Sequence, residues 1–428
     1  MPLRQSDENL DLYIIILLFL TWAHSCLESD PAVREEEGNS QSVDSGKQSP
    51  GFKTVVDSRG KEVLLPENPL RVATVSDALV EELMIVLGVE DRIVGIGSTC
   101  LIREFSYRYE SASGDIFSFQ GGMNPALFLR PQLKTLPLFV RPGTEINYET
   151  LAGLNPDVLI IDQGACTLPW RTDRELQERG LSRLESLGIP TILLKGINCT
   201  EPPRLEALSD VIRILGEVFN QTDKAARLAK YLEDSVQWVF DRTRDVGESE
   251  RPEVLLLGLD PLARAQGTVG NVYGKQDVHS YFVERIGAKN AFPGNQNVAT
   301  LSLEQLYAID PDVIILPTAN GYHPPRELYE VGFFQKLQPL KAIRDRRAGS
   351  LPWSPCNCDK RLEYPVDIYV IAKIAFPELF QNLNLAEKTL RLYQDVYGVD
   401  RQTALGILDA QWMDWILEGE DRSESLHR

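Results

Sequence analysis

The chain has 428 residues, 43% of them hydrophobic, which predicts two or three domains or one two-lobed domain with a full core. Its 44 basic and 62 acidic residues give a net charge of −18, which argues against a nucleic-acid partner and against a basic membrane-binding surface. Only four histidines occur, two of them in the terminal regions, which argues against a metal site built from several imidazoles.

An apolar run stands near the start of the chain. Tyr13 to Ala23 are uninterrupted apolar or small uncharged residues, and the run is shorter than the ~20 residues of a membrane-spanning helix. This length is typical of the core of a secretion signal. The run ends in "AHSC", which resembles the lipobox of prokaryotic lipoproteins and makes Cys26 a predicted lipidation site; an ordinary secreted protein cut near Ser25 is the alternative. Residues 27–51 are rich in Ser, Glu, Asp and Gly and are predicted to form a disordered tether.

The body of the chain begins near Phe52. "KTVVDSRGKEVLLP" predicts two short strands joined by a turn. Predicted strands and helices then alternate, and apolar runs such as Val158–Ile161 are typical of strands buried on both faces, so we predict a parallel α/β sheet. The predicted strands cover 71–76, 92–98, 157–162 and 190–196; the predicted helices cover 77–89, a segment from Tyr148, and 173–187. The long stretch Thr99–Glu145 shows no such alternation and is predicted to be irregular.

Two predicted amphipathic helices follow, and then a second series of predicted strands and helices. Pro203 to Asp245 carry apolar residues at helical spacing, and the part from Thr222 would reach ~36 Å at ~1.5 Å per residue, enough to join two lobes. "LSLEQLYAIDPDVIIL" (Leu301–Leu316) then repeats the pattern of "INYETLAGLNPDVLIID" (Ile146–Asp162): a capped helix, a Pro-Asp corner and a strand. Two equivalent α/β lobes explain this repeat, and a ligand site is expected in the cleft beyond their strand ends.

The order of these motifs resembles the substrate-binding proteins of ABC importers for iron–siderophore complexes, haem and vitamin B12. The resemblance lies in "VVDSRGKEVLLPENPLRVATVSDALVEELMIVLGVEDRIVGIGS", "YETLAGLNPDVLIID", "LGIPTILL" and "SLEQLYAIDPDVIIL", and spans roughly residues 53 to 399. It implies a protein without catalytic residues or a cofactor, which captures a metal chelate or a tetrapyrrole outside the cytoplasm. It also implies two partners, a membrane permease and, through it, ATPase subunits.

The resemblance gives the repeated glutamates a role. In the family, one surface glutamate on each lobe docks into arginine pockets of the permease, and the matching positions here are Glu149 and Glu304. A second interpretation needs no partner. Asn147 and Ser302 are typical N-caps, which places each glutamate in a first helical turn, where a negative charge offsets the helix dipole.

Ligand contacts are expected from the loops that follow strand ends. Aromatic rings there are suited to pack against a chelate or macrocycle, and cations are suited to pair with an anionic ligand. The alternatives are a place in the lobe's own core for each ring and ordinary surface exposure for each cation. The candidates are Asp77, Arg103, Trp170, Arg171, Arg264, Tyr273, Tyr322, Trp353, Lys360 and Arg361.

Five further cysteines fall in predicted loops: Cys100, Cys166, Cys199, Cys356 and Cys358. Disulfides or free thiols are favoured over metal ligation, because no Cys-x-x-Cys pair is present. A cysteine-ligated metalloprotein with nitrogenase-like lobes and an exported adhesion module remain as other classes. An enzyme is disfavoured, because the chain lacks Gly-x-Ser-x-Gly, Gly-x-x-x-x-Gly-Lys and His-Glu-x-x-His; the glycine-rich Gly267–Gly274 is expected to be a cleft loop.

The predicted fold class is therefore α/β, with two Rossmann-like lobes joined by a long rigid helix and a ligand cleft between the lobes. The predicted function is an extracytoplasmic, lipid-anchored receptor for an iron(III)–siderophore type of chelate, with a corrinoid (vitamin B12) or haem as the alternative ligand. The expected segments are a signal (1–26), a tether (27–51), an N-terminal lobe (52–203), a helical connection (204–246), a C-terminal lobe (247–412) and a polar tail (413–428).

Overall fold

The computed structural model describes residues 51–140, 146–168, 170, 173–259, 267–317, 324–353 and 360–418. The predicted signal, the lipidation site Cys26 and nearly all of the tether lie outside these ranges, as do Arg171, Arg264, Tyr322, Cys356 and Cys358. No helix in the described part of the chain is long and apolar enough to cross a bilayer.

The first sheet has four parallel strands in the order β4-β3-β7-β8. Every residue of β3, β7 and β8 is buried, as the uninterrupted apolar runs predict for strands covered on both faces. The strands are β3 (Val72–Val75), β4 (Ile93–Ile96), β7 (Val158–Asp162) and β8 (Thr191–Leu194); their helices are α1 (Leu79–Leu87), α3 (Tyr148–Gly153) and α4 (Arg174–Ser186). Strands β1 (Phe52–Val56) and β2 (Glu62–Pro66) form the predicted antiparallel pair before this sheet.

The second sheet is mixed, whereas the sequence predicted a parallel sheet for the first set of strands and only an α/β set here. Its parallel core is β9-β13-β14, and β10 pairs antiparallel with both β9 and β12. The strands are β9 (Glu253–Gly258), β10 (Gly270–Tyr273), β11 (Lys289–Asn290), β12 (Val298–Leu301), β13 (Val313–Leu316) and β14 (Ala348–Ser350). The helices around it are α8 (Val278–Arg285), α9 (Leu303–Ile309), α10 (Glu327–Glu330), α11 (Lys341–Arg344), α12 (Tyr364–Ala375), α13 (Leu385–Tyr397) and α14 (Arg401–Ala410).

Strand β10 corrects the expectation that Gly267–Gly274 is a cleft loop. Gly270 approaches the neighbouring strand so closely that a Cβ there would lie 2.2 Å from the carbonyl oxygen of Gly258. The glycine is therefore explained by close pairing of two strands, and not by the flexibility of a loop.

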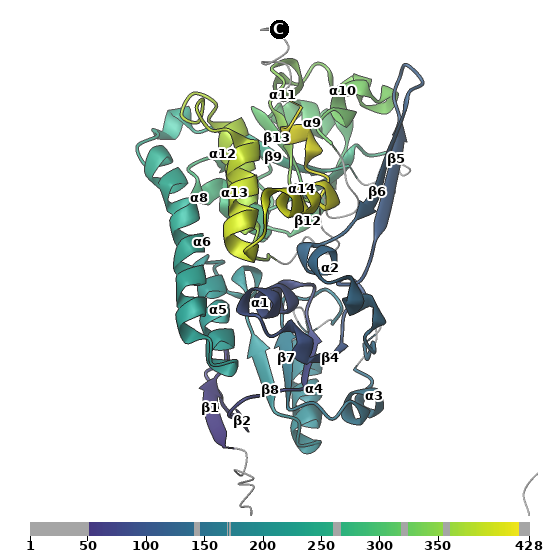
Figure 1. Ribbon diagram of the computed structural model, residues 1–428. Helices are drawn as coiled ribbons and strands as arrows, with labels where there is room; N and C mark the ends of the chain where they lie inside the picture. The colour runs from purple at the N-terminus through teal and green to yellow at the C-terminus, as the bar shows by residue number, and fades with distance from the viewer. Residues whose placement is uncertain are drawn as a thin grey trace, which may run out of the picture. The chain divides into compact units, whose positions relative to one another are not determined.

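The predicted connecting helices are α5 (Glu206–Val218) and α6 (Thr222–Thr243). The apolar stripe of α6 is buried as expected, with Ala225, Leu232 and Val236 inside the core. Helix α12 is fastened to α6, because the hydroxyl of Tyr364 donates to the Leu232 carbonyl at 3.3 Å and that of Tyr369 to the Ser235 carbonyl at 2.8 Å. Figure 1 shows α6 beside α5 near one end and beside α12 near the other.

The stretch 99–145, predicted to be irregular, contains a β-hairpin. Strands β5 (Phe105–Glu110) and β6 (Ile116–Gly122) pair antiparallel and lead to the short helix α2 (Pro125–Leu129). Figure 1 shows the hairpin reaching from α2 to α10. The Tyr107 hydroxyl donates to the Glu327 carboxylate at 2.7 Å, and the Ala112 amide donates to the Glu330 carbonyl at 2.7 Å.

The base of the same hairpin contacts the end of α14. The Met123 amide donates to the Ala410 carbonyl at 2.9 Å, and the Trp412 indole donates to the Gln120 carbonyl at 3.2 Å. Gly122 makes this packing possible, because a Cβ there would lie 2.4 Å from the Trp412 ring. The hairpin therefore ties the segment after β4 to the elements around the second sheet, in addition to the covalent connection through α5 and α6.

The segment predicted as a polar tail begins inside the fold. Met413 and Ile416 are buried, and Asp414–Ile416 form a 3-10 turn packed on the main core.

Candidate functional site

Asp77 joins three loops at the carboxyl edge of the first sheet. It follows β3 and is buried, and its Oδ1 accepts hydrogen bonds from the hydroxyls of Ser98 (2.5 Å) and Thr167 (3.3 Å). Its Oδ2 accepts from the Cys166 amide at 2.6 Å. The next residue, Ala78, has a φ of 102°, a conformation that is strained for alanine, so this turn is held by its surroundings. Asp77 thus fixes the loops after β3, β4 and β7, where the predicted ligand site lies.

Arg361 connects this edge to the elements of the second sheet. Its Nη1 donates to the Asp77 carbonyl at 2.9 Å, and its Nε donates to the Glu363 carboxylate at 3.1 Å. Glu82, in the first turn of α1, lies 3.7 Å from the same Nε and accepts from the Tyr397 hydroxyl at 3.1 Å. Burial and then the charge of Glu363 raise the pKa of Glu82 well above its usual value, although the Arg361 guanidinium opposes the shift.

Lys360 lies in a neighbouring buried chain of polar groups. Its ammonium contacts Nε2 of His279 at 2.7 Å and the Asp367 carboxylate at 2.6 Å. An ammonium only donates, so Nε2 accepts, and Nδ1 carries the proton that His279 shares with Asp277 at 2.7 Å. Burial alone would raise the pKa of Asp277, but the hydrogen bonds from the ring and backbone amide of His279 and the charge of Lys360 lower it below its usual value. This chain fixes the segment after β14 to α8.

Two of the cations predicted to contact a ligand are buried in these networks. Lys360 and Arg361 have side chains only 3% exposed, and both are paired with protein carboxylates. Their direct contact with a ligand stays a prediction; what the structure describes is an internal role. Four residues of these networks were not predicted from the sequence: Glu82, Asp277, His279 and Glu363. The sequence signal for them is a histidine two residues after an aspartate.

The predicted aromatic contacts occupy different places. Trp353 is buried and packs on Phe105 of the hairpin, at 4.7 Å between ring centroids, and on Trp412 at 4.9 Å. Tyr273 is buried at the end of β10, with its ring centroid 6.3 Å from that of His279. Arg103 is exposed, and its guanidinium lies 3.9 Å from the centre of the Phe105 ring. Their ligand contacts also stay predictions.

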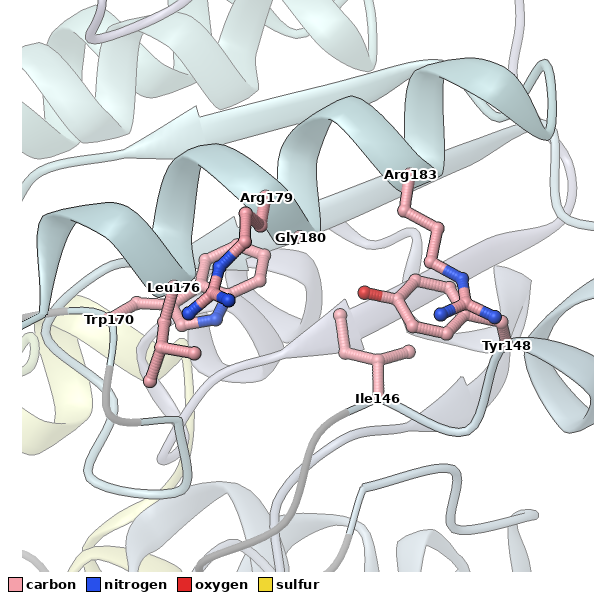
Figure 2. Close-up of a pocket in the computed structure, with 7 residues that line it drawn as sticks. All are labelled: Ile146, Tyr148, Trp170, Leu176, Arg179, Gly180 and Arg183. Atoms are coloured by element: carbon pink, nitrogen blue, oxygen red, sulfur yellow. The ribbon is translucent and has the colours of Figure 1, made fainter.

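Trp170 lies in a different place, a cavity of about 160 Å³ between α3 and α4. Figure 2 shows the guanidinium of Arg183 over the ring of Tyr148, at 4.5 Å from its centre, and Arg179 on the same face of α4. The cavity is lined by Ile146, Tyr148, Trp170, Leu176, Arg179, Gly180 and Arg183.

Glu149 and Glu304 occupy equivalent positions in the two halves of the chain. Both side chains are exposed in the first turns of α3 and α9. The predicted caps are confirmed: Asn147 accepts from the Thr150 amide at 3.0 Å, and Ser302 accepts from the Gln305 amide at 3.2 Å. Hydrogen bonds from its own amide and from Ser302 lower the pKa of Glu304, so its carboxylate is charged at neutral pH.

The described cysteines are of two kinds. Cys100 and Cys166, both beside the Asp77 edge, are in disulfide bonds, whereas Cys199 is a partly exposed thiol. Within the described ranges, no group of three or more His, Cys, Asp or Glu side chains is arranged to hold a metal ion.

Glu81 makes the stability of the folded protein depend on pH. It is fully buried in the first turn of α1, and burial raises its pKa to about 7. The folded state therefore holds this proton more tightly than the unfolded state, so stability falls as the pH rises from about 4.5 to above 7.

We expect Glu81→Gln to remove this loss, because glutamine keeps the neutral shape. The difference from 4.5 to about 7, at ~1.4 kcal/mol per pH unit, makes the variant about 3 kcal/mol more stable at pH 8 and nearly equal at pH 4.5. Urea unfolding at both values measures this, with the exposed Glu62→Gln as control. A variant that is less stable than the wild type at pH 8 would contradict the assignment.

The fold and the site together define the class of protein: a two-lobed α/β binding protein whose strand ends meet at an internal polar edge. A family model described as "Periplasmic binding protein" matches residues 72–323, more than half of the chain. The chain belongs to the periplasmic binding protein family, whose members bind and hand on substrates rather than transform them. This membership implies a location outside the cytoplasm. No curated protein matches the chain in sequence.

Several solved structures are similar in fold. A periplasmic solute-binding protein of Veillonella parvula DSM 2008 is 22% identical, with a TM-score of 0.64, over 86% of this chain and 98% of its own. The Haemophilus influenzae molybdate-binding protein MolA is 19% identical, with a TM-score of 0.59, over 81% and 98% of the two chains. Helicobacter pylori CeuE, solved with a Ni-His complex, is 14% identical, with a TM-score of 0.58, over 83% and 99%. At these identities the likeness shows the fold alone.

Proposed function

We propose that the chain is the solute-binding subunit of an ABC importer, which captures a metal chelate of the iron(III)–siderophore type and delivers it to a membrane permease. The observation that carries the proposal is the pair of exposed, capped glutamates, Glu149 and Glu304, at equivalent positions in two α/β halves. A helix-dipole role explains each glutamate by itself, but their equivalence suits a partner that contacts both halves at once.

Capture of a ligand between the lobes is favoured when the loops at the strand ends are already held in place. The Asp77 and Arg361 networks hold these loops. Asp77 fixes three loops after parallel strands, and Arg361 ties that edge to the segment after β14. Such preorganisation favours binding, because little side-chain freedom is lost when the ligand enters. The hairpin β5–β6 adds a second tie, so we propose that closure on the ligand is small.

The ligand class is also part of the proposal. Predicted cations and aromatic rings near the strand ends suit an anionic chelate, and the similar structures include one solved with a Ni-His complex and one with molybdate. A corrinoid or haem is the alternative from the same family. The cysteine-ligated alternative is weakened, because Cys100 and Cys166 are in disulfides and so are not thiolate ligands. Lipidation of Cys26 would hold the receptor at the membrane surface.

An absorbance spectrum and mass analysis of the protein as purified from its own cells tests the ligand class. We expect a charge-transfer band and the mass of a ferric chelate. A Soret or corrin band would replace the siderophore with the alternative ligand. A colourless protein that binds no added ferric chelate would overturn the ligand class.

A further inference from the structure

We infer that the cavity between α3 and α4 receives a carboxylate side chain of the permease, so that the docking contacts around Glu149 run in both directions. Glu149 would offer its carboxylate to a permease arginine, and Arg179 and Arg183 would accept an acidic side chain in return. This inference rests on the proposed function, because it takes the permease as the partner of this face.

The cavity is formed by specific packing between Trp170 and helix α4. Its floor is the buried Trp170, which packs on Gly180 in the middle of α4. A Cβ at Gly180 would lie 2.3 Å from the Trp170 ring, so only glycine admits the ring at this depth. Glycine is less favourable than alanine inside a helix, and the close packing of Trp170 gives a physical reason for its presence here.

The two arginines have unused capacity for an anion. Among the described residues, the only carboxylate within 4 Å of Arg179 is Glu175, at 3.9 Å, and no described carboxylate lies within 4 Å of Arg183. Arg183 is instead held over the Tyr148 ring, which orders its guanidinium before any partner arrives (Figure 2). An ordered guanidinium binds a carboxylate with two parallel hydrogen bonds, and this chain of net charge −18 presents two of them at one small cavity.

The cavity is too small for the proposed metal chelate, and its size favours a single side chain. Ligand pockets usually measure ~300–1,000 Å³, whereas this cavity measures about 160 Å³. Its position points to the permease: Tyr148, which lines the cavity, immediately precedes Glu149 in the first turn of α3. A permease surface that binds Glu149 therefore lies within reach of the cavity.

The test is the affinity of the purified, solute-loaded chain for its permease–ATPase complex in lipid nanodiscs. We expect Arg183→Glu to weaken this binding at least tenfold and to leave the affinity for the ferric chelate within twofold. Arg174→Glu is the matched control: it makes the same charge change on the same helix, at a side chain that does not line the cavity, and should change binding less than twofold. Gly180→Ala places a Cβ against the Trp170 ring and so displaces it, which should also weaken binding to the permease without any change of charge. Ser182→Ala, on the same helix, is its control.

Three results would overturn the inference. If Arg183→Glu and Gly180→Ala bind the permease like the wild type while Glu149→Arg fails to bind, the docking face is right and the cavity has no part in it. If Arg183→Glu weakens solute affinity equally, the cavity belongs to the solute site. If Glu149→Arg also binds normally, the proposed docking face itself is wrong.

Discussion

Cells that carry Glu149→Arg together with Glu304→Arg are expected to lose chelate uptake almost completely, while the purified variant keeps its ligand affinity within twofold. Both glutamates are exposed at helix starts and take no part in the hydrogen bonds described at the Asp77 edge, so their replacement leaves those loops intact. The two substitutions reverse the charge at both positions and place arginines against the permease guanidiniums. Like charges that face each other across an interface weaken binding by several kcal/mol. Uptake of radiolabelled iron and isothermal titration with the chelate measure the two effects separately.

A charge-matched control distinguishes docking from net charge. Glu217→Arg with Glu378→Arg changes two other exposed glutamates by the same total charge, and we expect normal uptake. Loss of the favourable helix-dipole interactions costs only ~0.3–1 kcal/mol at each first turn, so the docking variant should fold normally. Normal uptake by the docking variant would contradict the role of these glutamates.

Arg361→Met is expected to lower the free energy of unfolding by about 3–5 kcal/mol, the range for removing one partner of a buried ion pair. The substitution leaves Glu82 and Glu363 buried without the guanidinium that lies between them, and it removes the bond to the Asp77 carbonyl. Urea unfolding at pH 7 measures the loss. The loss should shrink as the pH falls, because burial raises the pKa of Glu82 and its protonation neutralises a carboxylate that has lost its cation.

Arg391→Met is the control for this prediction. Its ion pair with Asp395 is exposed on the arginine side, and such surface pairs contribute ~0–1 kcal/mol. If Arg361→Met costs no more than Arg391→Met, the Arg361 network does not hold the two halves of the site together.

The parts of the fold that were predicted from the sequence depend on local patterns. The strands Val72–Val75 and Val158–Asp162 are each apolar at every position but one, and the caps Asn147 and Ser302 precede an acidic first turn. The hairpin was missed although Phe105, Tyr107 and Tyr109 alternate with polar residues in the manner of a strand. Its apolar side is covered by residues more than 200 positions away, among them Glu327 and Trp412, which no local pattern reveals.

The same limit applies to the site. Lys360 and Arg361 follow one another in a polar segment, and the sequence favours surface exposure or a ligand for both. Their burial depends on partners as distant in the chain as His279 and Asp77, so only the fold brings the charges together. The mixed pairing of β10 also depends on a long-range contact, the close approach of Gly270 to Gly258.

The most direct test of a receptor role is uptake of iron chelate by cells that lack this chain. We predict that deletion abolishes uptake at submicromolar chelate, and that the wild-type chain restores it while Glu149→Arg with Glu304→Arg does not. Undiminished uptake in the deletion strain, with no other solute whose import is lost, would contradict the account.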